Sequence, residues 1–103
     1  EKVQRGALNN IRNLYQEVGR EYLRVELVVH GAGLTLLTKK DSTLAPELAQ
    51  LKTAYEAEFT ACSNTMKAQG LTRADLLDQV GRTVPAMVRL MELQEEGWAY
   101  IKP

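Results

Sequence analysis

The sequence predicts a small α/β domain built on a parallel sheet. Segments with helical spacing of apolar residues alternate along the chain with short apolar runs that favour strands. This alternation is typical of parallel sheets, because each helix returns the chain to the end where the next strand begins. The chain has 103 residues, of which 45% are hydrophobic and 25% charged. That size and composition fit a single globular domain spanning residues 1–103.

The opening segment predicts an amphipathic helix that ends at Gly19. Its apolar residues recur at helical spacing, and polar residues fill the other positions. The apolar positions are Val3, Ala7, Leu8, Ile11, Leu14, Tyr15 and Val18. Glycine is a common stop signal just after such a pattern, so the helix is expected to end there.

Residues 23–29 predict the first strand. Their alternation gives way to a continuous apolar run, as in a strand that enters a sheet covered on both faces. The run ends at the small turn His30-Gly31-Ala32-Gly33, which lacks the third glycine of a dinucleotide-binding loop. A short helical segment is expected over residues 34–38.

The middle of the chain allows two interpretations. Pro46 fits the first turn of a helix whose face carries Leu44, Leu48, Leu51 and Tyr55. No proline or glycine interrupts residues 47–69, so one long helix through Cys62 is possible, and the protein would then be an all-helical interaction module. The alternation over residues 57–62 instead favours a strand that ends near Cys62. Periodicity leaves both interpretations open.

The last third of the chain predicts four further elements. Gly70 ends the preceding helix, and residues 72–75 have the form of a capping box that opens a short helix. Residues 80–84 fit a brief strand, Pro85 fits the first turn of a helix, and residues 98–101 fit a final strand. The apolar face expected for that helix consists of Val84, Met87, Val88, Met91 and, less clearly, Leu90.

Composition excludes several classes of function. Lysine plus arginine and aspartate plus glutamate each number 13, so the net charge is zero, unlike that of a nucleic-acid-binding domain. No apolar run reaches the roughly 18 residues of a membrane span, so neither nucleic acid nor a membrane is expected as a partner. No cofactor is expected, and no metal, because His30 and Cys62 supply too few ligands for structural zinc. A single cysteine fits reducing and oxidising surroundings alike, so the location stays open: cytoplasmic or, if an upstream signal was removed, periplasmic.

Cys62 is the strongest candidate functional residue, because it is the only cysteine and precedes a helix-forming stretch. A thiol at a helix start faces the positive end of the helix dipole, which favours the reactive thiolate. The plainer interpretation is a small buried hydrophobic side chain. Ser63, Asn64 and Thr65 are first of all expected to cap the helix. His30, at the carboxyl end of a strand, is a candidate proton shuttle or a turn residue bonded to backbone.

The remaining conspicuous side chains have structural interpretations. Trp98 and Tyr100 are expected in the core or at a subunit interface, and the methionines in the core. These methionines are Met66, Met87 and Met91. A cysteine hydrolase using Cys62 and His30 is not favoured, because no protease signature surrounds the cysteine.

Four runs of the sequence resemble the DsrE/DsrF-like family, in the right order along the chain. They are Leu8-Asn9-Asn10-Ile11-Arg12-Asn13, Val28-Val29-His30-Gly31-Ala32-Gly33-Leu34, Ala61-Cys62-Ser63-Asn64-Thr65 and Gly97-Trp98-Ala99-Tyr100-Ile101-Lys102-Pro103. The resemblance implies a three-layer αβα fold with a mostly parallel sheet, assembled as a trimer or hexamer. It also places the family's cysteine after a strand on Cys62, which favours the strand interpretation. Family members begin with a strand before the first helix, so a domain truncated at the N-terminus and lacking that strand is expected.

The same resemblance implies a function. Better-studied relatives take part in sulfur oxidation or sulfur relay and carry sulfur as a cysteine persulfide. The expectation is therefore a sulfur carrier, sulfurtransferase-like at most, that accepts sulfur on Cys62 and passes it between donor and acceptor proteins. His30, Ser63, Asn64 and Thr65 are the supporting candidates. The alternative is a non-catalytic oligomeric binding protein of the same fold in which Cys62 is structural.

Overall fold

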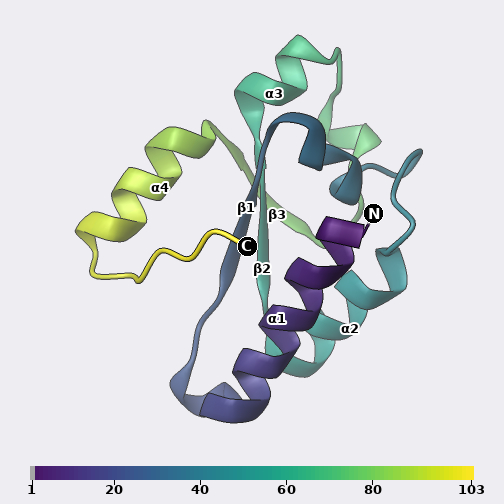
Figure 1. The fold of residues 1–103 in the computed structure, drawn as a ribbon. Coiled ribbons are helices and arrows are strands. Elements are labelled where there is room, and N and C mark those ends of the chain that lie inside the picture. Colours follow the sequence, from purple (N-terminus) through teal and green to yellow (C-terminus); the bar gives the residue numbers. More distant parts are fainter. Residues whose placement is uncertain (1) are drawn as a thin grey trace.

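The computed structural model describes residues 2–103, in which helices and strands alternate along the chain (Figure 1). The longer helices are α1 (Lys2–Val18), α2 (Ala45–Tyr55), α3 (Ser63–Ala68) and α4 (Ala86–Glu95). The strands are β1 (Glu26–Val29), β2 (Glu58–Cys62) and β3 (Val80–Val84), and short 3-10 helices are η1 (Arg20–Tyr22), η2 (Gly31–Leu37) and η3 (Arg73–Asp75). The strands form one parallel sheet in the order β1-β2-β3. Helices α1 and α2 cover one face and α4 lies on the other, which confirms the three-layer α/β class.

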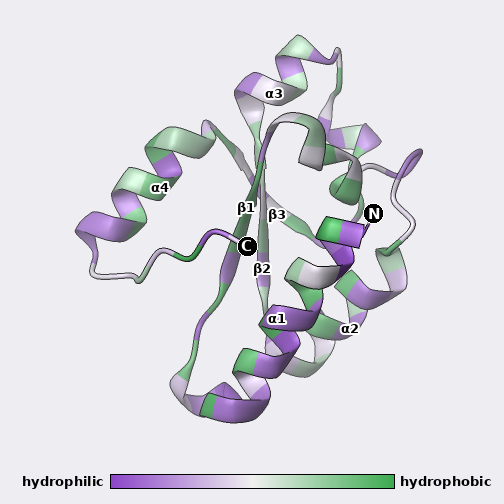
Figure 2. Cartoon of the chain, viewed as in Figure 1, coloured by the Kyte–Doolittle hydropathy of each residue, from purple (hydrophilic) through white to green (hydrophobic). Residues whose placement is uncertain are grey.

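The core lies between the sheet and the α1–α2 layer, and its apolar positions appear green on these elements in Figure 2. Helix α1 contributes Leu8, Ile11 and Tyr15, as its periodicity predicts. The Tyr15 ring stacks on Tyr55 of α2, with centroids 4.7 Å apart and planes within 6°. Aromatic pairs add to the roughly 1.5–3 kcal/mol that each fully buried large apolar side chain contributes. This packing fixes α1 against α2, although Val3 at the start of α1 is exposed.

Residues 44–69 fold as a helix, a strand and a second helix, so the interpretation as one continuous helix is wrong. Helix α2 ends at Glu56, whose φ of 60° and ψ of 31° place it in the left-handed region. Its N–H donates to the Lys52 carbonyl at 2.9 Å, and the chain then enters β2. Phe59, Thr60 and Ala61 of β2 are fully buried, because the strand is central and covered on both faces. The all-helical module is therefore excluded.

The strand register brings Cys62 to one corner of the sheet. Glu26 pairs with Glu58 on one side of β2, and Cys62 pairs with Val84 on the other, after a register shift between Phe59 and Thr60. All three strands run parallel, so Cys62 and the end of β3 lie at the same carboxyl edge. Helix α4 begins two residues after Val84 and therefore starts beside Cys62.

Two expectations about the strands need correction. The first strand begins at Glu26, so residues 23–25 precede the ladder. Residues 98–101 form no strand within the described chain; they run extended past β1 (Figure 1). Trp98 is half-buried, with Arg24 4.9 Å from its ring centre, and Tyr100 is exposed, so neither belongs to the core.

The predicted apolar face of α4 is wrong at three positions, whereas Val84 and Leu90 of that face are half-buried. Met87, Val88 and Met91 are 56%, 50% and 62% exposed, and the residues that α4 buries are Ala86 and Leu93. Periodicity locates an apolar stripe but does not say that the sheet lies beneath it. Met66 is buried in the core as expected, whereas Met87 and Met91 are not. In the described part of the chain, no helix is long and apolar enough to cross a membrane.

Candidate thiol site

Cys62 is the last residue of β2 and the N-cap of α3. Its backbone is extended, with φ −71° and ψ 116°, and the next residue, Ser63, begins the helix. The side chain is 6% exposed. The strand-to-helix junction that the resemblance implied is therefore present, and it holds the thiol in a largely buried position at the carboxyl edge of the sheet.

A second helix start reaches the same sulfur. The N–H of Ala86, the first residue of α4, donates to the Cys62 Sγ at 3.4 Å. This contact follows from the register, because Cys62 pairs with Val84 and only Pro85 lies between β3 and the helix. The amide of the first helical residue has no partner inside its own helix, so it is free to bind an acceptor in front of it.

The surroundings lower the pKa of the Cys62 thiol. Burial acts first and raises the pKa, because it disfavours the charged form. The Ala86 N–H, the N–H and hydroxyl of Thr65, and the Asn64 N–H oppose burial by donating towards the sulfur. Together they place the pKa below the ordinary value of a cysteine. The site therefore favours a thiolate without a positively charged side chain.

Thr65 connects the thiol to the end of β1. Its Oγ1 accepts a hydrogen bond of 3.0 Å from the Gly31 N–H, which leaves its hydroxyl proton available to the sulfur. The Gly31 carbonyl in turn accepts from Gln69 Nε2 at 3.3 Å. Gly31 has a φ of 62°, a conformation that glycine adopts readily and that turns its N–H towards α3. The turn after β1 and helix α3 are thus joined beside Cys62.

The other predicted site residues occupy different positions around this junction. Ser63 is partly buried and Asn64 is exposed, in the first turn of α3. The prediction that these side chains cap the helix is wrong, because Cys62 is the N-cap of α3 and Ser63, Asn64 and Thr65 lie inside the helix. His30 lies one residue before Gly31 and is exposed, and among the described residues its ring makes no hydrogen bond or ion pair. The structure therefore joins Thr65 to Cys62 and leaves His30 outside this hydrogen-bonded group.

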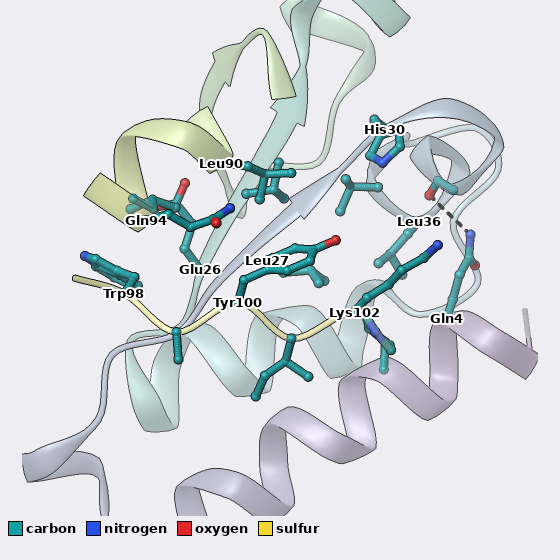
Figure 3. A pocket seen from close by; sticks show the side chains of 18 of the residues that line it. Gln4, Glu26, Leu27, His30, Leu36, Leu90, Gln94, Trp98, Tyr100 and Lys102 are labelled. Carbon is teal, nitrogen blue, oxygen red and sulfur yellow. Dashed lines mark hydrogen bonds between the residues drawn. The ribbon is translucent and has the colours of Figure 1, made fainter. Parts of the chain in front are cut away.

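A cavity of about 350 Å³ lies along the outer edge of β1 (Figure 3). Helix α1, strand β1, helix α4 and the extended segment of residues 98–103 line it. His30 stands at one end and Trp98 at the other. Cys62 does not line it, so the cavity and the thiol are separate features of the molecule. Among residues 2–103, no three side chains of histidine, cysteine, aspartate or glutamate are grouped so as to hold a metal ion.

A buried ion pair between β1 and α4 was not predicted from the sequence. The Glu26 side chain is completely buried and accepts two hydrogen bonds from Arg89, of 2.8 Å from Nε and 2.7 Å from Nη2. Thr60 Oγ1 donates to the same carboxylate at 2.6 Å, and Arg82 lies 3.3 Å from it. The signal available in the sequence was a glutamate at the start of an apolar strand, together with an arginine inside an apolar helix.

Comparison with known proteins decides the family. The model of the DsrE/DsrF-like family matches residues 6–103, nearly the whole chain. The chain belongs to the DsrE/DsrF-like family. This family is associated with sulfur relay, and the match confirms the resemblance drawn from the four sequence runs.

A solved structure of the same fold supports this membership. It is MTH1491, a protein of unknown function from Methanobacterium thermoautotrophicum, with a TM-score of 0.86 and 34% sequence identity. The alignment covers 94% of this chain and 84% of that one. Comparison with curated proteins gave no match. The fold and the family are therefore shown.

Proposed function

We propose that this protein carries sulfur as a persulfide on Cys62 and passes it to a thiol of a partner protein. The observation that carries the proposal is the Ala86 N–H at 3.4 Å from Sγ, at a thiol whose pKa is lowered. A carrier needs a thiolate to attack the donor, and N–H groups aimed at the sulfur stabilise that charge. Membership in a family associated with sulfur relay supports the same chemistry.

The reaction consists of two exchanges at sulfur. In the first, the Cys62 thiolate attacks the outer sulfur of a donor persulfide, the donor S–S bond breaks, and the donor leaves as a thiolate. Cys62 then holds the outer sulfur and its proton as a persulfide. In the second, an acceptor thiolate attacks that outer sulfur and Cys62 leaves as a thiolate. Each step forms one S–S bond and breaks another, so no external oxidant or reductant is consumed.

The neighbouring residues have proposed roles in these steps. The amides of Ala86 and Thr65, with the Thr65 hydroxyl, stabilise the charge on the Cys62 sulfur when it attacks and when it leaves. Asn64, which is exposed two residues after the thiol, has the proposed role of hydrogen-bonding an outer sulfur. Ser63 is a second such group, and His30 is a proton shuttle only if the turn after β1 rearranges.

We also propose that the carrier is a homo-oligomer, a trimer or hexamer as the family resemblance implies. Helix α4 presents a row of exposed apolar side chains, Met87, Val88 and Met91, within about one and a half turns of the Ala86 amide. Burying such side chains is favourable, and exposed apolar patches on small domains mark interfaces. Assembly through this face would place subunit contacts next to the thiol.

The alternative is an oligomeric binding protein in which Cys62 is structural. The observation in its favour is the 6% exposure of the side chain, because a persulfide must be reached by both donor and acceptor. A purely structural cysteine would react slowly with sulfur donors. The two functions therefore differ in a directly measurable property.

The test is the intact mass of the folded, reduced protein after incubation with polysulfide. The carrier predicts a gain of about 32 Da, one sulfur atom, that dithiothreitol removes. Cys62→Ser is the matched control, since the chain has no other cysteine and the variant should gain nothing. An unchanged mass of the wild-type protein, under conditions that convert a free thiol, would favour the binding protein.

A further inference from the structure

Helix α4 holds the Ala86 amide against the Cys62 sulfur, yet few apolar contacts hold α4 itself. The residues it buries are Ala86 and Leu93, near its two ends, while Met87, Val88 and Met91 face outward. Helices usually dock on a sheet through an apolar stripe. Here only Leu90 of that stripe is half-buried, beside β1, and the other three side chains point away, so the first turns of α4 need a further interaction to fix them.

That interaction is the buried pair of Arg89 and Glu26. Arg89 binds both oxygens of the Glu26 carboxylate, at 2.8 and 2.7 Å, in a geometry that fixes direction as well as distance. Glu26 reaches from β1 towards α4 (Figure 3) and is held by Thr60 of β2 at 2.6 Å. The carboxylate is therefore anchored to two strands and holds α4 through a single residue.

Arg89 lies one helical turn beyond Ala86. Its own N–H donates to the Pro85 carbonyl at 3.0 Å, so the backbone of Arg89 is bonded to the residue that starts the helix. A helical turn is stiff because its backbone hydrogen bonds close it. A displacement of the Arg89 side chain is therefore passed to Pro85 and Ala86 rather than absorbed between them.

We propose that Arg89 is a positioning residue for the Cys62 thiol: its pairing with Glu26 sets the first turn of α4 so that the Ala86 N–H stays directed at Sγ. The role rests on the proposed function and deepens it, since it explains what keeps an N–H donor aimed at the sulfur of a site that has no cationic side chain. It concerns the thiol itself and is measurable without any sulfur donor.

The variant Glu26→Gln separates positioning from simple electrostatics. It keeps the shape of the side chain but breaks the ion pair, so positioning predicts that the Ala86 amide shifts and the thiol pKa rises. Simple electrostatics predicts the opposite sign, because removing a negative charge near the site favours the thiolate. Arg82→Gln is the matched control: Arg82 also pairs with Glu26, at 3.3 Å, but belongs to β3 and does not hold α4.

The experiment is the rate of iodoacetamide alkylation against pH for the wild-type protein, Glu26→Gln, Arg89→Met, Arg89→Lys and Arg82→Gln, with folding checked by circular dichroism. We expect Glu26→Gln and Arg89→Met to raise the midpoint by at least about half a pKa unit, roughly a threefold loss of thiolate below the midpoint. Arg89→Lys keeps the charge but not the bidentate geometry. Its midpoint should therefore lie between that of the wild-type protein and those of Glu26→Gln and Arg89→Met. Arg82→Gln should match the wild type.

A wild-type or lower midpoint in Glu26→Gln or, if that variant does not fold, in the charge-retaining Arg89→Lys would overturn the proposal; a rise in Arg89→Met alone does not support it, because loss of a positive charge also raises the thiol pKa. An equal rise in Arg82→Gln would also overturn it, because loss of any partner of Glu26 would then suffice. Polysulfide loading of the wild-type protein is measured in parallel. Failure to load contradicts the carrier function while leaving the comparison of midpoints valid, so the two failures are distinguishable.

Discussion

The amide of Ala86 and the sulfur of Cys62 are hydrogen-bonded at 3.4 Å although 24 residues separate them in the chain. The first residue of α4 thus donates a hydrogen bond to the residue that precedes α3. The relationship exists because β2 and β3 run parallel and pair Cys62 with Val84 at their carboxyl ends. The predictions that follow depend on this junction and on the sheet that forms it.

The lowered thiol pKa predicts a shifted pH profile of reactivity. Burial raises the pKa of the Cys62 thiol, but the hydrogen-bond donors, Ala86 foremost, lower it by more than burial raises it. The pH of half-maximal alkylation should therefore lie below the pKa of a free cysteine, roughly 8.5. The measurement is alkylation rate against pH, with a short unstructured cysteine peptide as control. A midpoint at or above that of the peptide would show that burial dominates.

The same shift links stability to pH. A group with a depressed folded pKa stabilises the folded state fully above its unfolded pKa, and this contribution is lost as pH falls through the folded pKa. The free energy of unfolding of the wild type relative to Cys62→Ser should therefore rise with pH as the solution passes through the folded pKa and level off above the unfolded one. Urea titrations of both proteins at several pH values measure the difference, and a flat or falling difference would contradict the shift.

Thr65→Val removes a hydroxyl that accepts from the Gly31 N–H at 3.0 Å and acts on the sulfur. We expect the thiol pKa to rise and stability to fall by about 1–2 kcal/mol, because the Gly31 amide loses its acceptor. Thr65→Ser is the control and should retain both properties, since it keeps the hydroxyl. Urea unfolding and the alkylation profile check this together. A Thr65→Val protein with wild-type pKa would remove Thr65 from the site.

Glu56→Gly should stabilise the protein. Glu56 adopts a φ of 60° at the end of α2, a conformation that costs a residue with a side chain roughly 1–2 kcal/mol. Its ion pair with Arg20 is solvent-exposed, and such pairs contribute about 0–1 kcal/mol. We expect a net gain of about 0.5–1 kcal/mol by urea unfolding, with Glu56→Ala losing stability as the control. Equal stabilities of the two variants would show that the left-handed turn is not formed.

The position of β1 at the edge of the sheet predicts how fast its amide hydrogens exchange with solvent. Glu58 donates to the Val25 carbonyl at 2.9 Å, so in this parallel register the backbone groups of Leu27 face β2 and those of Glu26 and Val28 face the cavity. We expect the Val28 amide to exchange with solvent much faster than the Leu27 amide. In a chain that carries the strand implied by the resemblance ahead of the first helix, we predict that this strand pairs here and protects Val28. Amide exchange measured by NMR on both chains checks this, and a slow Val28 amide in the 103-residue chain would contradict an open edge.

The sequence predicted most elements because local signals and tertiary structure agree there. Gly19 ends α1 with a φ of 96°, Pro46 lies in the first turn of α2, and Thr72 with Asp75 forms the predicted capping box. Each signal acts within one turn of the chain, so no knowledge of the rest of the fold is needed. The segment leading to Cys62 was different, because the cap of α2 is a glutamate and the alternation over residues 57–62 was too weak to decide between helix and strand without the family resemblance.

The details of the site depended on contacts between distant parts of the chain. The Cys62 residue and its junction were predicted, but the Ala86 amide arrives through β3 pairing, which no local pattern encodes. The outward face of α4 was missed for a related reason, since a buried partner for Arg89 reverses which side of the helix meets the sheet. The Trp98 segment has strand-like composition, yet it runs past the outer edge of β1 without joining the sheet in the described chain.

The central claim is that Cys62 passes on the sulfur it accepts, and transfer tests it most directly. The protein would be loaded with polysulfide, separated from the excess, and mixed with a small thiol, with the intact mass followed in time. The account predicts that the added mass of about 32 Da disappears and that the thiol gains it as a persulfide, at a rate that rises with the thiolate fraction of the acceptor. A loaded protein that keeps its sulfur indefinitely, or that never loads while remaining folded, would contradict the carrier function.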